Sequence, residues 1–445
     1  MQMLQTAAVS GEPFRPAPQP FARTTYHDHS PATSEQLAAA AQIFELGNRL
    51  RREALIEQRG RLIAAKAALV APARAARAAL HAVHEYGAVT AEHSGVSRLR
   101  QFAWLWWLNL RHNYNPRDVY RFQQFSRDRA MPIPLFLQWE QAALLYRTVI
   151  LRTDRAAAEI LADKRRFAGW CAEHGIPTAQ NLMEFEDGRI TRDFTRDASA
   201  LHTDLFAKWG TKYGGDATER WLYNGDDSYV DDQQRVWTFA EITESLAERS
   251  REGVVLLQPR LVNHAALRPL SPKALSTIRV MTIQRPREAP RFLAAVLRMG
   301  TGDATADNFA QGGIASAIDA DTGVIGDARR IDKQYRTHVY QTHPDTGVPF
   351  AGYRVPFWSE SVRLALDAHA RLGQIACVGW DVAVLEDGPV LIEGNWNPCT
   401  KLLQVATQVP LLTTEFADTY TAWLAEPECC VDDRWLVEQE RWQPV

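Results

Sequence analysis

Long apolar runs, a secretion signal and paired cysteines are all missing from this sequence. The longest conspicuous apolar run, residues 102–110, has nine residues, whereas a membrane-spanning helix needs about 20. Residues 11–20 are polar and rich in proline, which is unlike the basic and then apolar start of an exported protein. The five cysteines are scattered without a CxxC pair, which disfavours a disulfide framework and a zinc site. We therefore expect a cytoplasmic protein with reduced thiols and no membrane span.

What the sequence does contain is typical of a packed protein with two or three folding units. Of its 445 residues, 46% are hydrophobic and 23% are charged, so disorder and fibrous structures are disfavoured. Residues 1–150 hold 18 Lys and Arg against 11 Asp and Glu, whereas the rest of the chain holds 32 against 42. The positive part could face a nucleic acid, an acidic glycan or a membrane, but its arginines are spread along helices, and solvated helix faces are the better expectation. No nucleic-acid partner is expected.

The first part of the chain is predicted to be helical. Residues 1–32 are rich in proline, alanine and glutamine without a period and are expected to form a flexible leader. In residues 33–160, apolar side chains recur at steps of three and four, as in amphipathic helices. Pro72 is expected to break or end the first helix, and Gly87 to cap its continuation. The aromatic-rich segment 98–125 is predicted to be a helix buried against the rest of the protein, in preference to an interfacial membrane anchor.

From residue 161 the pattern changes to helical segments that alternate with short β-branched runs, which predicts an α+β unit up to residue 425. The predicted strands are residues 254–258, 278–283, 292–298, 378–385 and 390–392. The Asp-Ala-Asp-Thr-Gly sequence at 319–323 is expected to be a hairpin turn. Residues 426–445 are expected to form a polar C-terminal tail.

The most informative segment places Asp381 on one predicted strand and Glu393 on the next, with Asn395 on the same face as Glu393. Two carboxylates and one carboxamide oxygen form the kind of ligand set that Mg²⁺ takes when it also binds phosphate oxygens. On this segment alone, a hairpin whose acidic residues face water is the preferred interpretation.

Further upstream, several cations and flexible segments could contact a phosphate ligand. Lys208 follows an apolar run and precedes a glycine-bearing loop that includes Gly214 and Gly215, although two lysines on a surface hairpin would look the same. Arg279 and Arg298 lie within predicted buried strands, where a charge needs an anionic partner. That partner could be a ligand or a structural salt bridge.

The order and spacing of these pieces resemble the ATP-grasp superfamily, and most closely its sugar-transfer-associated group. The resemblance covers about residues 160–425 and implies an α+β ATP-grasp fold, in which two α+β subdomains grip ATP, preceded by a mainly helical N-terminal domain. The pieces that carry it are Asp163-Lys164, Gly175-Ile176-Pro177, Lys208, Gln258, Thr277-Ile278-Arg279, Arg298, Asn308 with Gly312-Gly313, Asp381, and Glu393-Gly394-Asn395 with Pro398.

The resemblance also implies roles for individual residues. The subdomain boundary would fall near residues 258–261, and its backbone would meet adenine. The residues implied to contact the nucleotide are Lys164, Lys208, Gly214, Gly215, Gln258, Pro259, Arg260 and Leu261. Those implied to bind one or two Mg²⁺, for which Mn²⁺ could substitute, are Asp381, Glu393 and Asn395. Those implied to act on the transferring phosphoryl group or the substrate carboxylate are Arg279, Arg298 and Asn308.

The expected activity is ATP-dependent ligation of a small-molecule carboxylate to an amine through an acylphosphate, with positioning and electrostatics as the main sources of catalysis. A kinase on the same scaffold is an alternative, and it would need a general base near the acceptor, for which Asp307 and His264 are candidates. A nucleotide-binding protein without turnover is a third hypothesis. The oligomeric state is not predictable from the sequence.

Overall fold

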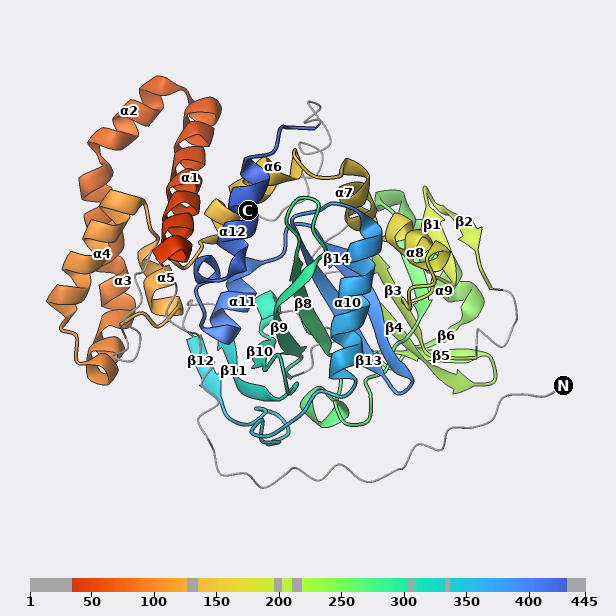
Figure 1. Ribbon diagram of the computed structural model, residues 1–445. Coiled ribbons are helices and arrows are strands. Elements are labelled where there is room, and N and C mark those ends of the chain that lie inside the picture. Colours follow the sequence, from red (N-terminus) through yellow and green to blue (C-terminus); the bar gives the residue numbers. More distant parts are fainter. Residues whose placement is uncertain are drawn as a thin grey trace.

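The computed structural model describes residues 34–125, 135–195, 202–209, 218–302, 307, 309–332 and 337–429. Helices lead into two antiparallel seven-stranded sheets, which lie beside one another (Figure 1). The mixed helix and sheet fold with a helical N-terminal region agrees with the predicted fold class. The predicted leader and nearly all of the predicted tail lie outside the described ranges. None of the described helices is long and apolar enough to cross a membrane.

In the part of the chain that the structure describes, eight helices precede the sheets. The first seven are α1 (Ser34–Arg59), α2 (Arg61–Leu69), α3 (Ala71–Ser94), α4 (Arg98–His112), α5 (Pro116–Arg121), α6 (Trp139–Ile150) and α7 (Arg155–Ala162). Pro72 lies in the first turn of α3, where its missing N–H costs no helical hydrogen bond, so the break falls just before it.

The predicted cap at Gly87 is wrong, because Gly87 lies buried inside α3 and the helix ends instead at Gly95 in a left-handed conformation. Gly87 allows α4 to approach closely. The side-chain amide of Gln101 donates to its carbonyl at 3.1 Å, and a Cβ at Gly87 would lie 3.1 Å from the side-chain oxygen of Gln101.

The prediction that the aromatic-rich segment is buried is only half right. On α4, Leu105 and Leu108 are buried, but Trp104, Trp106 and Trp107 are exposed. The segment is helical as predicted, with Ser97 capping its start through a hydrogen bond to the backbone of Arg100. The remaining face of α4 points away from the protein core.

The N-terminal sheet consists of β1 to β7. Its strands are β1 (Met183–Glu186), β2 (Arg189–Asp193), β3 (Leu205–Trp209), β4 (Thr218–Gly225), β5 (Ser228–Asp231), β6 (Val236–Thr238) and β7 (Val255–Pro259), in the order β2-β1-β7-β3-β4-β5-β6. Helix α9 (Phe239–Arg249) covers this sheet, and α8 (Lys164–Glu173) precedes it. The sheet has its own hydrophobic core, in which Trp221, Tyr229 and Phe185 are fully buried.

The C-terminal sheet consists of β8 to β14. Its strands are β8 (Thr277–Ile283), β9 (Arg291–Met299), β10 (Ile314–Ile318), β11 (Ile325–Ile331), β12 (Thr337–Tyr340), β13 (Cys377–Leu385) and β14 (Gly388–Asn395), in the order β12-β11-β10-β9-β8-β13-β14. The predicted turn at 319–323 joins β10 to β11, which confirms that hairpin. The accompanying helices are α10 (Trp358–Leu372), α11 (Thr400–Thr407) and α12 (Glu415–Leu424), and short 3₁₀ turns cover Ser250–Glu252, Arg268–Leu270, Phe309–Gln311 and Leu411–Thr413.

The C-terminal sheet and the N-terminal helices share one continuous core. Buried side chains from α1 and α6 belong to the same cluster as those of β8, β13 and α12. The contact is specific as well as apolar, because the hydroxyl of Tyr146 in α6 donates to the carbonyl of Pro398 at 3.0 Å, and its ring packs edge-on against Tyr420 in α12. On the other face of the sheet, α10 packs against β8 through a hydrogen bond between His369 and Thr282 at 2.7 Å.

Candidate functional site

Three charged residues lie in one row across three neighbouring strands of the C-terminal sheet. Asp381 on β13 stands opposite Arg279 on β8 and opposite Glu393 on β14. The predicted pairing of the Asp381 and Glu393 strands is therefore confirmed, although Asp381 lies within its strand and not at its end. Arg279 donates from Nε to the Asp381 carboxylate, and both side chains are buried. The sheet register alone thus brings two of the predicted site residues into contact.

Arg298 on β9 joins this pair. Its guanidinium donates to the second carboxylate oxygen of Asp381 at 2.7 Å and lies 3.3 Å from Asp307. Asp307 in turn accepts from the backbone N–H of Thr277 at 2.7 Å and from its hydroxyl at 2.6 Å. We call Arg279, Arg298, Asp307 and Asp381 the arginine–aspartate cluster.

The charges of this cluster hold one another in place. Burial alone would raise the pKa of Asp381, but the charges of Arg279 and Arg298 lower it below its ordinary value. Burial would likewise lower the pKa of Arg298, yet Asp307 and Asp381 raise it. For Asp307 the effect of burial prevails, and its pKa is raised. The two arginines are therefore fixed cations whose orientation is set by buried carboxylates.

Of the three residues predicted to bind a metal ion, two are in direct contact and the third is engaged by arginines. The side-chain amide of Asn395 donates to the carboxylate of Glu393 at 3.2 Å, so these two are in contact. Both oxygens of Asp381 already accept from arginines, so Asp381 would have to share an oxygen with a metal ion. Within the described ranges, no group of three or more His, Cys, Asp or Glu side chains is placed to hold a metal. The oxygen-only donor set still fits a hard cation such as Mg²⁺ in its chemistry.

A glycine allows the row to form. A Cβ at Gly379 would lie 2.5 Å from Cβ of Pro398 and 3.3 Å from Cδ of Arg279. Gly379 therefore leaves room for the Arg279 side chain and for the turn that follows β14. These contacts are the steric reason for a glycine two residues before Asp381.

Two lysines reach the same region from outside the C-terminal sheet. Lys208 lies within β3, not after it as predicted, and Lys164 at the start of α8 donates from Nζ to the carbonyl of Trp209 at 3.2 Å. Burial, and next the charge of Lys164, lower the pKa of Lys208 from 10.5 to about 8, while Glu393 acts in the opposite direction. Paired cations with one nearby carboxylate make an electrostatic setting suited to a polyphosphate.

The segment predicted to meet adenine connects the two sheets. β7 ends at Pro259 and β8 begins at Thr277. The side chain of Gln258 is buried and donates to Asn181 at 2.8 Å. The backbone N–H of Arg260 donates to the carbonyl of Asp204 at 2.7 Å, and its guanidinium pairs with the carboxylate of the same residue at 2.9 Å.

Some predicted residues cannot be placed. Gly214, Gly215 and Asn308 lie outside the part of the chain that the structure describes. His264 lies at the β13–β14 turn, with Nε2 3.7 Å from Glu386, and is not part of the arginine–aspartate cluster.

No role was predicted for Thr277 from the sequence. In the structure its hydroxyl accepts a hydrogen bond from Nε of Arg298 at 2.9 Å and donates one to Asp307. The sequence signal that could have revealed this role is its position two residues before Arg279, which puts both side chains on the same face of a strand.

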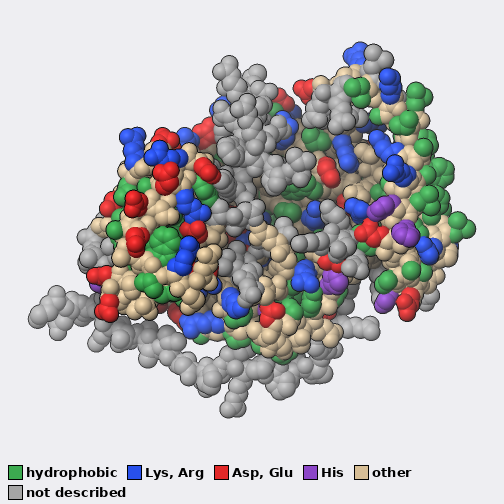
Figure 2. Space-filling model, turned by 180° about the vertical axis from the view of Figure 1, so that it is seen from behind, with side chains coloured by type: hydrophobic (Ala, Val, Ile, Leu, Met, Phe, Trp, Pro, Cys, Tyr) green, Lys and Arg blue, Asp and Glu red, His purple; other side chains and the backbone are tan. Residues whose placement is uncertain are grey.

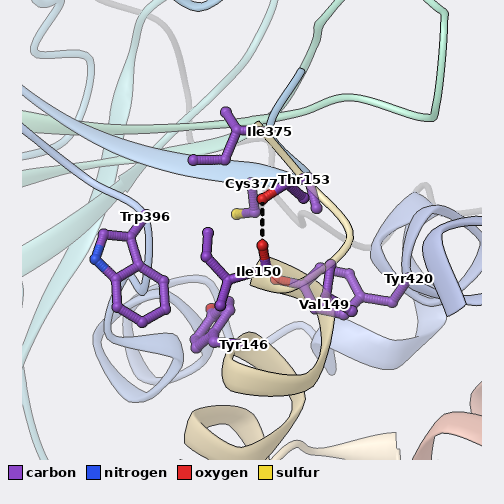
Figure 3. A pocket seen from close by; sticks show the side chains of 9 residues that line it. Tyr146, Val149, Ile150, Thr153, Ile375, Cys377, Trp396 and Tyr420 are labelled. Carbon is purple, nitrogen blue, oxygen red and sulfur yellow. Dashed lines mark hydrogen bonds between the residues drawn. The ribbon is translucent and has the colours of Figure 1, made fainter. Parts of the chain in front are cut away.

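A small pocket lies behind the site, between α6, α12 and the start of β13 (Figure 3). Its lining is mainly apolar and aromatic, and includes Tyr146, Cys377, Trp396 and Tyr420. Burial raises the pKa of the Cys377 thiol well above its ordinary value, so this thiol stays protonated and unreactive. The pocket lies at the start of β13, the strand that carries Asp381.

Comparison with known proteins agrees with this geometry. A model of the family described as "Sugar-transfer associated ATP-grasp" matches residues 149–417, which is more than half of the chain. Together, the two sheets, the charged row and this match define an ATP-grasp protein. Within that class, the chain belongs to the sugar-transfer-associated ATP-grasp family.

Two solved structures are distantly similar to this chain. D-alanine–D-alanine ligase from Bacillus anthracis in complex with ATP is 12% identical with a TM-score of 0.35, over 61% of this chain and 70% of that one. An N5-carboxyaminoimidazole ribonucleotide synthetase in complex with ADP is 9% identical with a TM-score of 0.32, over 54% of this chain and 46% of that one. The chain thus spans less than half of the synthetase, and likenesses of this size carry no functional argument. A comparison with curated proteins found no match.

Proposed function

We propose that this protein is an ATP- and Mg²⁺-dependent, ADP-forming ligase that joins a small-molecule carboxylate to an amine. The observation that carries the proposal is the set of oriented cations: Arg279 and Arg298 are fixed by Asp381, and Lys208 lies close enough to Glu393 for their charges to interact. Such a set favours negative charge that develops on a transferring phosphoryl group.

In the proposed reaction, a substrate carboxylate oxygen attacks the γ-phosphorus of ATP, the bond to the β-phosphate oxygen breaks, and ADP leaves. The amine then attacks the acyl carbon, phosphate leaves, and the amine loses a proton. Lys164 and Lys208 would bind the phosphates of the nucleotide, and Arg279 and Arg298 would stabilise the charge on the transferring group. A bound Mg²⁺ or Mn²⁺, held by Glu393 and Asn395 with Asp381, would neutralise phosphate charge.

The kinase alternative has less support. Asp307, the better of the two candidate bases, accepts two hydrogen bonds from Thr277 through one carboxylate oxygen, and its other oxygen lies 3.3 Å from Arg298. A carboxylate engaged in this way is held as a structural partner and is poorly placed to collect a proton from a substrate hydroxyl.

The proposal is tested by incubating the full-length protein with ATP, Mg²⁺ and pooled carboxylates and amines, while following the nucleotide and new masses. ADP, free phosphate and an amide product are the expected result. ADP with a phosphorylated acceptor and no free phosphate would establish the kinase instead, and ATP binding without any turnover would establish a binding protein.

A matched pair of variants tests the metal assignment. Glu393→Gln keeps the size of the side chain and removes its charge, and it should abolish turnover while weakening nucleotide binding much less. Asp387→Asn makes the same change at an exposed position in the turn of the same hairpin and should leave turnover unchanged. Near wild-type turnover in Glu393→Gln would show that the metal assignment is wrong.

A further inference from the structure

Helix α4 is apolar on two faces, of which only one is buried. Leu105 and Leu108 pack into the core. On the opposite side, Leu99, Trp106 and Leu110 recur at helical spacing and are 77%, 38% and 43% exposed. Trp107 and Trp104, 47% and 43% exposed, extend this side around the helix. We call these five residues the α4 apolar face. An exposed apolar surface of this kind often marks a contact with protein or lipid.

The face continues beyond α4. The indole N–H of Trp106 donates to the carbonyl of Pro72 at 3.1 Å, so the junction of α2 and α3 adjoins it, and there Leu69 and Val70 are exposed. The rings of Trp104 and Trp107 stack with their centroids 5.3 Å apart. The result is a broad apolar surface with indole groups at its centre, larger than isolated exposed side chains would make.

The charge around this surface is predominantly positive. Helix α4 carries Arg98, Arg100 and Arg111 and no acidic residue, and residues 61–112 together hold seven Lys and Arg against two Glu. The chain after residue 150 holds ten more acidic than basic residues. Figure 2 shows hydrophobic side chains beside Lys and Arg over the helical region, at the right of that view. An anionic surface would therefore attract this end of the molecule and repel the rest.

From this juxtaposition we propose that the α4 apolar face docks peripherally on an anionic lipid membrane. Tryptophan has an apolar body and a polar N–H, which suits the boundary between acyl chains and headgroups. The arginines on the same helix would contact lipid phosphates while their aliphatic stems lie on the apolar surface. A helix with Trp and Leu on one side, flanked only by arginines, has the composition of an interfacial helix. The helices remain on the surface and do not span the membrane.

The test is cosedimentation of the full-length protein with vesicles of phosphatidylcholine containing phosphatidylglycerol, and with vesicles of phosphatidylcholine alone, without nucleotide. We expect binding to the anionic vesicles, which weakens as salt is added. Arg100→Gln with Arg111→Gln should weaken binding about 30-fold, since each arginine near an anionic surface contributes about fivefold. Trp104→Ser with Trp107→Ser should abolish it.

Two exposed residues elsewhere provide controls. Val236→Ser on β6 and Arg363→Gln on α10 remove an exposed apolar and an exposed basic side chain far along the chain from α4, and both variants should bind as the wild type does. Unchanged far-ultraviolet circular dichroism and melting would establish that the tryptophan and arginine variants are folded.

Four results would overturn the proposal. The first is a wild-type protein that binds neither kind of vesicle, and the second is equal binding by the Trp104→Ser, Trp107→Ser variant. The third is a solution dimer that the same variant converts to a monomer, with no vesicle binding by either, since this would assign the α4 apolar face to a second copy of the chain. Capture of another protein without vesicle binding would also contradict it.

Discussion

Lys208 should make nucleotide binding depend on pH in a defined way. In the free protein, burial and the charge of Lys164 lower the pKa of Lys208 to about 8. A phosphate placed between these lysines would favour the charged form, so the pKa should rise when a nucleotide binds. If the pKa of Lys208 rises when a nucleotide binds, binding above pH 8 is accompanied by proton uptake. The affinity for the nucleotide therefore falls as the pH rises.

The magnitude follows from the free-state pKa. The charged fraction of Lys208 falls from about nine-tenths at about pH 7 to about one-tenth at about pH 9. If only the charged form binds well, the dissociation constant for ADP should rise about tenfold over this interval and change little below about pH 7. The lost binding free energy is about 1.4 kcal/mol.

Isothermal titration calorimetry with ADP, which is not turned over, measures this dependence directly. Lys208→Arg is the matched control, because arginine stays charged throughout the interval and its profile should be flat. Lys208→Met should bind weakly at every pH with an equally flat profile. A wild-type profile without the tenfold change, or the same slope in Lys208→Arg, would refute the reasoning, because the titrating group would then be another one.

Three further predictions concern stability. Asp381→Asn leaves two buried arginines without their full counter-charge and should lower the free energy of unfolding by about 3–5 kcal/mol in urea titrations. Gly379→Ala places a Cβ 2.5 Å from Pro398 and should lower the free energy of unfolding by about 1–3 kcal/mol. Gly326→Ala, which has open space around the new Cβ, should leave the free energy of unfolding nearly unchanged. Burial lowers the pKa of His369 from 6.5 to about 4. As the pH falls, the unfolded chain takes up the proton before the folded protein does. The free energy of unfolding should therefore fall by about 3 kcal/mol between about pH 6.5 and about pH 4. This loss should be absent in His369→Gln, and an equal loss in that variant would exclude His369 as its cause.

Strands and their pairing were the most predictable part of the fold. The β-branched runs at 278–283 and 378–385 correspond to β8 and β13 within one residue, because apolar runs of that length bounded by turns have few alternatives. The adjacency of Asp381 and Glu393 followed from a two-strand hairpin with a short turn. The contact between Asp381 and Arg279 was not predictable, since it depends on the register between strands about 100 residues apart.

The local sequence pattern predicted the structure poorly at two places: where two helices pack closely together, and where an apolar helix face is exposed. Gly87 looked like a helix end, but it lies inside α3 because α4 needs the space beside it. The tryptophans of α4 looked like core because aromatic density usually means burial. Periodicity shows that a residue shares a face with another, but not whether anything covers that face.

The shared core has a consequence for how this chain can be divided. The region matched by the family model begins at residue 149, near the end of α6, yet Tyr146 in the same helix is fully buried against Pro398 and Tyr420. Cutting at the family boundary would remove that side chain and uncover the surface beneath it. The residues that share one core with the C-terminal sheet therefore extend further towards the N-terminus than the residues that the family model matches.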